Sequence, residues 1–100
     1  MSNTIKHAID ELENKIIGYR KDCLQYNECK LMISKLNVEI DNIKHSWYYE
    51  DEDLLTVTLK LNTAISDLMW YREAVDLSLH AVKHAAYRLG RFRSFTSAEP

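Results

Sequence analysis

The chain has 100 residues with only two glycines and one proline, Pro100. This excludes a loop-rich or all-β fold, which needs turn residues every ~8–12 positions. Hydrophobic residues make up 46% of the chain, which excludes a disordered chain. Charged residues make up 28%, and no apolar run reaches ~18 residues, so we expect no membrane span. A net charge of −2 excludes binding to nucleic acids or membranes through global charge alone.

The first half of the chain is predicted to be helical. Its apolar residues recur in alternating steps of four and three, the spacing of a helix that packs along a seam, with one extra step of three before Cys29. Because Gly18 is the only glycine in this segment and proline is absent, we predict one helix over about residues 4–47. A break near Gly18 or Asn27 is the alternative. The row consists of Ile5, Ile9, Leu12, Ile16, Tyr19, Cys23, Tyr26, Cys29, Ile33, Leu36, Ile40, Ile43 and Trp47.

The pattern stops at residues 48–53, which are predicted to form a turn, and resumes in a second helix over about residues 54–89. Asp51 or Asp53 suits the cap of this helix, and Gly90 suits its end, which leaves a polar tail over 91–100. Residues 55–61 also alternate with period two, as in a strand. A lone strand would lack a partner, so we favour the helix. The row consists of Leu54, Val57, Leu61, Ala64, Leu68, Tyr71, Val75, Leu79, Val82, Ala86 and Leu89.

Two helices of similar length joined by a short turn predict an all-α fold, a long antiparallel helical hairpin resembling a coiled coil, in a single domain over 1–100. Folding the chain in this way brings three acids of the first helix toward three arginines near the end of the second. The acids are Asp10, Glu11 and Glu13, and the arginines are Arg88, Arg91 and Arg93.

Further apolar residues flank both rows, and they form a surface wider than two helices can cover. Burying each of these side chains stabilises by about 1.5–3 kcal/mol. We therefore expect a homodimer that forms a four-helix bundle. A monomer whose first helix breaks to give three or four helices is the alternative. The flanking residues are Ile17, Leu24, Leu31, Met32, Val38, Leu55, Leu59, Met69, Trp70 and Leu77.

No motif typical of nucleophilic catalysis or phosphate binding occurs in the sequence. Cys23 and Cys29 would lie about 9 Å apart along one helix, too far for a disulfide within the chain, and a cytoplasmic protein is the simplest interpretation. His80 and His84 have the spacing of a two-histidine metal face, but a zinc site needs three or four ligands. We expect no catalytic residues, no metal site and no cofactor.

Two pairs of acids with i, i+3 spacing, Glu50 with Asp53 and Glu73 with Asp76, could hold Mg²⁺ if they converged. The pattern loosely resembles the all-α nucleotide pyrophosphohydrolases of the MazG type, whose motif is ExxE followed by ExxD. The resemblance implies Mg²⁺-dependent hydrolysis of nucleoside triphosphates. Asp53 departs from the motif, and one straight helix would hold the two pairs about 34 Å apart.

The turn combines aromatic and acidic side chains. Aromatic residues anchor protein interfaces, and a cluster of carboxylates can imitate phosphates in the basic groove of a nucleic-acid enzyme. We therefore interpret the turn as a partner-binding site. The alternative is that Trp47 closes the end of the bundle and the acids form a solvated turn. The predicted partner-binding residues are Trp47, Tyr48, Tyr49, Glu50, Asp51, Glu52 and Asp53.

The C-terminal end is basic and is interleaved with aromatic residues. Lys83, Arg88, Arg91 and Arg93 stand in a stretch without acids. Such a surface can neutralise phosphates and stack bases, although cations also suit the end of a helix.

The sequence therefore favours a non-enzymatic protein–protein interaction module, an adaptor, regulator or inhibitor of another protein. Small inhibitors that phages and mobile elements direct at host nucleic-acid enzymes are one such class. Binding of nucleic acid through the basic end and a MazG-like hydrolase are the alternatives.

Overall fold

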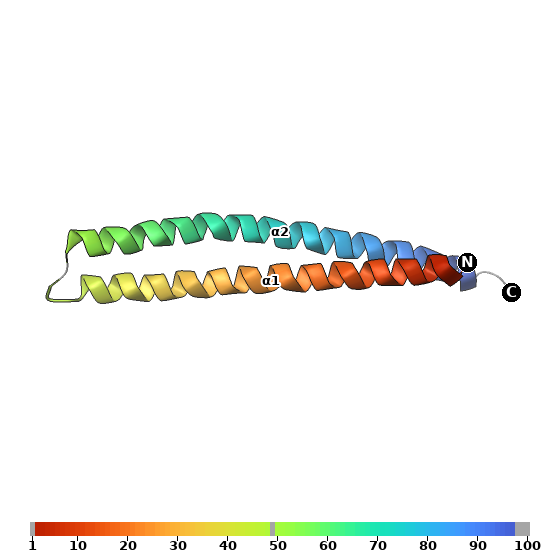
Figure 1. The fold of residues 1–100 in the computed structure, drawn as a ribbon, viewed down its shortest axis with the longest axis horizontal. Helices are drawn as coiled ribbons and strands as arrows, with labels where there is room; N and C mark the ends of the chain where they lie inside the picture. Colours follow the sequence, from red (N-terminus) through yellow and green to blue (C-terminus); the bar gives the residue numbers. More distant parts are fainter. Residues whose placement is uncertain (1, 49, 98–100) are drawn as a thin grey trace. The chain divides into compact units, whose positions relative to one another are not determined.

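The computed structural model describes the backbone of residues 2–48 and 50–97, and the side chains of residues 4–48 and 50–91. Helix α1 spans Ser2–Lys44 and helix α2 spans Asp51–Ser97 (Figure 1). No strand occurs in the described ranges, which confirms the all-α prediction and the helical interpretation of residues 55–61. Helix α1 continues through Gly18 and Asn27, so the predicted alternative of a break at either position is wrong.

Backbone hydrogen bonds set the two helix ends beside the turn. The amide of Ser46 bonds to the carbonyl of Ile43 at 3.1 Å, and α1 ends at Lys44, three residues earlier than predicted. The carbonyl of Glu50 accepts the amides of Asp53 and Leu54 at 3.1 and 3.3 Å. Glu50 therefore holds the capping position that we predicted for Asp51 or Asp53.

Helix α2 does not end at Gly90, where the sequence predicted its last turn. It continues to Ser97, and the described glycines have no positive φ. The left-handed backbone that would make Gly90 a terminating residue is therefore not used. The residues after it are free of proline until Pro100, so the helical hydrogen bonds can continue, and residues 91–97 are helical rather than a polar tail.

The chain forms two compact units. We call Leu24–Glu73 the turn unit, and Met1–Cys23 with Ala74–Pro100 the terminal unit. Within each unit, a segment of α1 runs antiparallel to a segment of α2 (Figure 1). The predicted antiparallel helical hairpin is thus confirmed.

The core of the turn unit is built from the two predicted apolar rows. Leu36, Val57 and Ala64 are buried together, and Cys29 is buried with its Sγ donating a hydrogen bond to the Ala64 carbonyl at 3.3 Å. The partly buried residues packed around this core are Ile33, Ile40, Ile43 and Leu61. Every one of these residues belongs to a predicted row, because the spacing of three and four places one face of each helix in contact with the other.

The seam of the terminal unit differs in register from the prediction. Ala8 and Ala85 are its buried residues, whereas the predicted Ile9 and Ala86 are exposed. The part-buried Ser78 also lies in the seam, where its hydroxyl donates to the Asp22 carboxylate. With Ser78 and Ala85 in place of Leu79 and Ala86, the row on α2 alternates steps of three and four from Leu54 to Leu89. The predicted row instead takes two successive steps of four around Val75.

The apolar residues that flank the seams remain exposed. All ten residues of the flanking set predicted from the sequence are more than half exposed. Among the side chains that the structure describes, no large one is fully buried, as expected where two helices alone cover each other. In a homodimer a second copy of the chain would cover this surface, and the homodimer stays a prediction.

Candidate protein-interaction site

The turn between the helices is held by side-chain hydrogen bonds. Ser46 Oγ donates to the carbonyl of Tyr48 at 2.9 Å and accepts the Tyr48 amide at 3.4 Å. The carbonyl of Asp41, near the end of α1, accepts both the His45 amide at 3.0 Å and His45 Nδ1 at 2.7 Å. These bonds restrain the backbone on both sides of Trp47.

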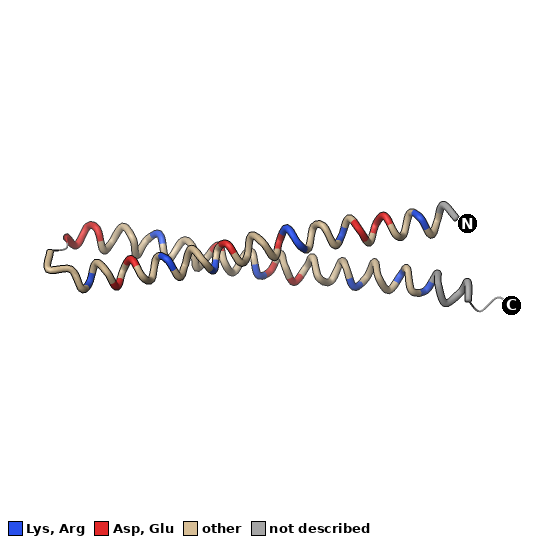
Figure 2. The backbone as a smooth tube through the Cα atoms, turned by 90° about the horizontal axis from the view of Figure 1, so that it is seen from below, with Lys and Arg blue, Asp and Glu red and all other residues tan. Residues whose placement is uncertain are grey.

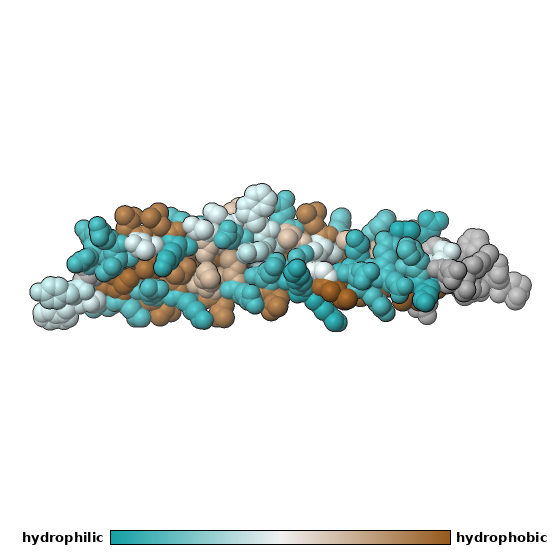
Figure 3. All heavy atoms as spheres, in the orientation of Figure 1, coloured by the Kyte–Doolittle hydropathy of each residue, from teal (hydrophilic) through white to brown (hydrophobic). Residues whose placement is uncertain are grey.

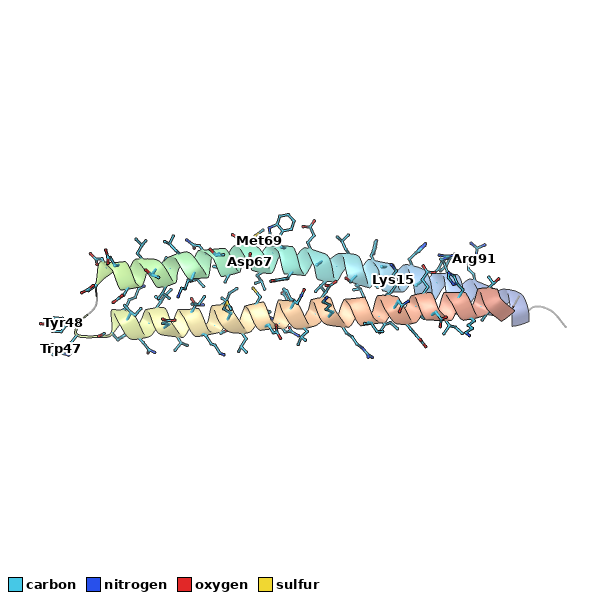
Figure 4. The ribbon with its side chains drawn as sticks, viewed as in Figure 1. Lys15, Trp47, Tyr48, Asp67, Met69 and Arg91 are labelled. Atoms are coloured by element: carbon cyan, nitrogen blue, oxygen red, sulfur yellow. The ribbon has the colours of Figure 1, made fainter. Side chains whose placement is uncertain are left out.

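Trp47 and Tyr48 present their rings almost entirely to solvent. Trp47 is 99% exposed and Tyr48 is 93% exposed, and both side chains project from the turn away from the helices (Figure 4). Trp47 therefore does not extend the apolar row of α1, and it does not close the end of the bundle. Tyr49, the third predicted aromatic residue, lies outside the described residues.

The acids of the predicted partner-binding site lie immediately after these aromatic residues. Asp51, Glu52 and Asp53 form the first turn of α2, and Figure 2 shows acidic residues at this end of the helix. These three side chains are exposed, as is that of Glu50. Negative charge at this end of a helix is favoured by the helix dipole. The turn unit thus brings two exposed aromatic rings and four carboxylates to one end of the helix pair.

The signal that sequence reasoning missed in the turn is Ser46. A serine whose hydroxyl bonds the backbone two residues further along is a recurrent turn device. Its place between the last apolar residue of α1 and the two aromatic residues could have identified it. In the structure Ser46 is a positioning residue, because it orders the backbone that carries both rings.

The basic end lies in the terminal unit and is partly neutralised. Arg88 forms an ion pair with Glu11, with Nη1 and Oε2 3.3 Å apart, as predicted from folding the chain about its turn. Lys83 and Arg91 are exposed, and Lys83 lines a shallow hollow on α2 with His80, His84 and Tyr87. The side chain of Arg93 lies outside those described. One of the predicted phosphate-binding cations is therefore already engaged by a carboxylate.

The two carboxylate pairs of the MazG-like pattern are held apart by α2. Asp53 and Glu73 both belong to this unbroken helix, and their separation of 20 positions corresponds to about 30 Å at the helical rise of ~1.5 Å per residue. One metal ion cannot be shared by both. In the described part of the chain, no three histidine, cysteine or acidic side chains are grouped closely enough to hold a metal ion.

The two cysteines pack between the helices and do not form a reactive site. Cys29 is buried, and Cys23 is half-buried on the same helix. Burial, together with the negative charge of Asp67, raises the pKa of the Cys29 thiol above its ordinary value. A nucleophilic cysteine requires the opposite shift.

The chain matches no protein-family model, no curated protein and no solved structure. In the described residues, neither helix has a stretch long and apolar enough to cross a bilayer.

Proposed function

We propose that this chain is a non-enzymatic protein-interaction module that docks on another protein through its turn. The observation that carries the proposal is the nearly complete exposure of Trp47 and Tyr48 on a backbone restrained by Ser46. Large aromatic side chains are the commonest anchors of protein interfaces. A restrained backbone lowers the entropy that ordering costs on binding.

The four carboxylates of residues 50–53 define the chemistry of the partner. A complementary surface would offer an apolar pocket for an aromatic ring beside arginine or lysine side chains. The basic groove of a nucleic-acid enzyme has this character, because it is built to receive phosphates. A role as an inhibitor or regulator of such an enzyme is the specific form of the proposal.

Binding of nucleic acid through Lys83, Arg88, Arg91 and Arg93 is the second candidate. It is weakened by the ion pair between Arg88 and Glu11. If the basic end were the functional surface, affinity would fall steeply with added salt, and substitutions in the turn would have no effect.

The test compares three forms of the chain as bait in host lysate, with captured proteins identified by mass spectrometry. The forms are wild type, the double variant W47A/Y48A, and Y87A as a matched control. Tyr87 is an exposed aromatic residue in the terminal unit, so its loss changes surface hydrophobicity without touching the turn.

We expect one protein to be captured by wild type and by Y87A but not by W47A/Y48A. A fourth form, the charge-neutral variant D51N/E52Q/D53N, should capture less of this protein than wild type does. Equal capture by all forms, or loss only with Y87A, would contradict docking through the turn.

A further inference from the structure

A continuous face of α2 in the turn unit carries no charge. Between Leu54 and Tyr71 the only charged residues are Lys60 and Asp67, and neither belongs to this face. Because α2 repeats its seam every seven residues, the positions opposite the seam form one surface. Those positions are all exposed. This uncharged face consists of Leu55, Thr56, Leu59, Asn62, Thr63, Ser66, Met69 and Trp70.

Large apolar side chains stand at both ends of the uncharged face. Leu55 and Leu59 lie at one end, and Met69 and Trp70, which are 71% and 72% exposed, lie at the other. Met69 projects from α2 on the side away from α1 (Figure 4), and hydrophobic side chains gather on the surface of this unit (Figure 3). Depletion of charge with exposed aromatic and methionine side chains is the composition of an interface core.

The two charged residues lie seven positions apart, along one side of the uncharged face. Lys60 and Asp67 are exposed, and both line a shallow groove that Met32 of α1 and Thr63 of α2 also line. A spacing of seven puts them on the same line along the helix. The midpoint between them falls between residues 63 and 64.

A twofold axis at this midpoint makes the surface complementary to itself. In an antiparallel pair of α2 helices, Lys60 of each copy would stand beside Asp67 of the other. Trp70 of one copy would then face residue 57 of the other, at a level between Leu55 and Leu59. A parallel pair would place the Lys60–Asp67 line of each copy on opposite sides of the contact, where the charges would not pair.

The residues near the proposed axis are small and uncharged. Asn62, Thr63 and Ser66 allow two helices to approach closely, while the larger side chains at the two ends fill the space on either side. The large side chains of the two copies therefore meet only at the two ends of the contact. The distance between the two helix axes is set by the small side chains in the middle.

We propose that a second copy of this chain docks antiparallel on the uncharged face of α2, with Lys60 of each copy beside Asp67 of the other. The face extends over 16 positions, from Leu55 to Trp70, which is about 24 Å, and a helix is about 10 Å wide, so the contact is roughly 240 Å² in projection. Stable interfaces bury about 800 Å² on each partner. The dimer is therefore weak and forms in the micromolar range or above.

Sedimentation equilibrium from about 1 to 500 µM, a range that spans weak interfaces, tests the pairing through reversal of charge. The variants are K60D, D67K and K60D/D67K, with K35D as a matched reversal on an exposed residue of α1. We expect the wild type, the double variant and K35D to dimerise. Each single variant should associate at least about tenfold more weakly. An equimolar mixture of K60D and D67K should regain dimers, because each charge then meets its opposite.

Tryptophan quenching provides a second readout that does not depend on charge. In W47F the remaining Trp70 should become shielded from acrylamide as the concentration rises, whereas in W70F the remaining Trp47 should stay accessible throughout. A wild-type mass of 11.8 kDa over the whole range would overturn the proposal. So would dimers that K60D and D67K leave unchanged, while circular dichroism shows every variant folded.

Discussion

The same substitution at two positions of α1 should have very different effects on the free energy of unfolding. Leu36 is 8% exposed in the core of the turn unit, whereas Leu31, on the same helix, is 57% exposed. Truncation to alanine removes three carbons, worth about 0.8 kcal/mol each when buried. Leu36→Ala should cost about 3 kcal/mol once the cavity is included.

Leu31→Ala should cost about 1 kcal/mol or less, because more than half of its side chain is already in water and alanine slightly favours the helix. The difference of about 2 kcal/mol corresponds to roughly 8–16 °C in the melting temperature of a chain of this size. Thermal and urea unfolding followed by circular dichroism at low micromolar concentration measure both. Equal losses at the two positions would show that the seam does not run through Leu36.

Three further predictions concern the glycines inside the helices and the buried thiol. Gly18→Ala and Gly90→Ala should each raise the free energy of unfolding by about 0.5–1 kcal/mol, because a Cβ meets nothing within 4 Å at either site; destabilisation by Gly90→Ala would place the end of α2 at that residue. Cys29 should react with iodoacetamide more slowly than Cys23. The pKa of the Cys29 thiol in the folded chain is raised above its ordinary value of 9.0. The contribution of Cys29 to the free energy of unfolding should therefore be constant below pH 9.0 and fall above it. Urea unfolding of C23S from about pH 7 to 10 measures this dependence.

The seam of the turn unit could be predicted because apolar spacing alone decides which face is buried. Leu36, Val57 and Ala64 follow the spacing of three and four, and the structure buries them together. The flanking residues were recognised as surplus for the same reason, and they are exposed. Periodicity thus predicts both what two helices cover and what they leave open.

The seam of the terminal unit differs from the prediction at single positions, because the sequence interpretation gave hydrophobicity more weight than register. The apolar Leu79 was preferred to Ser78, but the hydroxyl of Ser78 is satisfied by Asp22, so a polar residue occupies the seam without an unpaired group. Small side chains gave a second ambiguity, since Ala85 and Ala86 are equally apolar and only packing distinguishes them.

The strand-like alternation of residues 55–61 has a simple origin in the structure. One row, with Val57 and Leu61, faces α1, and a second row, with Leu55 and Leu59, faces outward. A helix that is apolar on two opposite faces shows apolar residues at almost every second position. The uncharged face on which we propose that a second copy docks is therefore what made residues 55–61 resemble a strand. The absence of charge at the positions of this face was the sequence signal that could have identified it.

Amide hydrogen exchange tests docking through the turn most directly, with the free chain compared to its complex with the captured protein. Residues 45–48 and 50 are exposed and lie outside both helices, so in the free chain their amides should exchange faster than those inside the helices. In the complex, slowed exchange at these residues with no change over 80–91 is the predicted result. Protection confined to 80–91 would contradict the account and assign binding to the basic end.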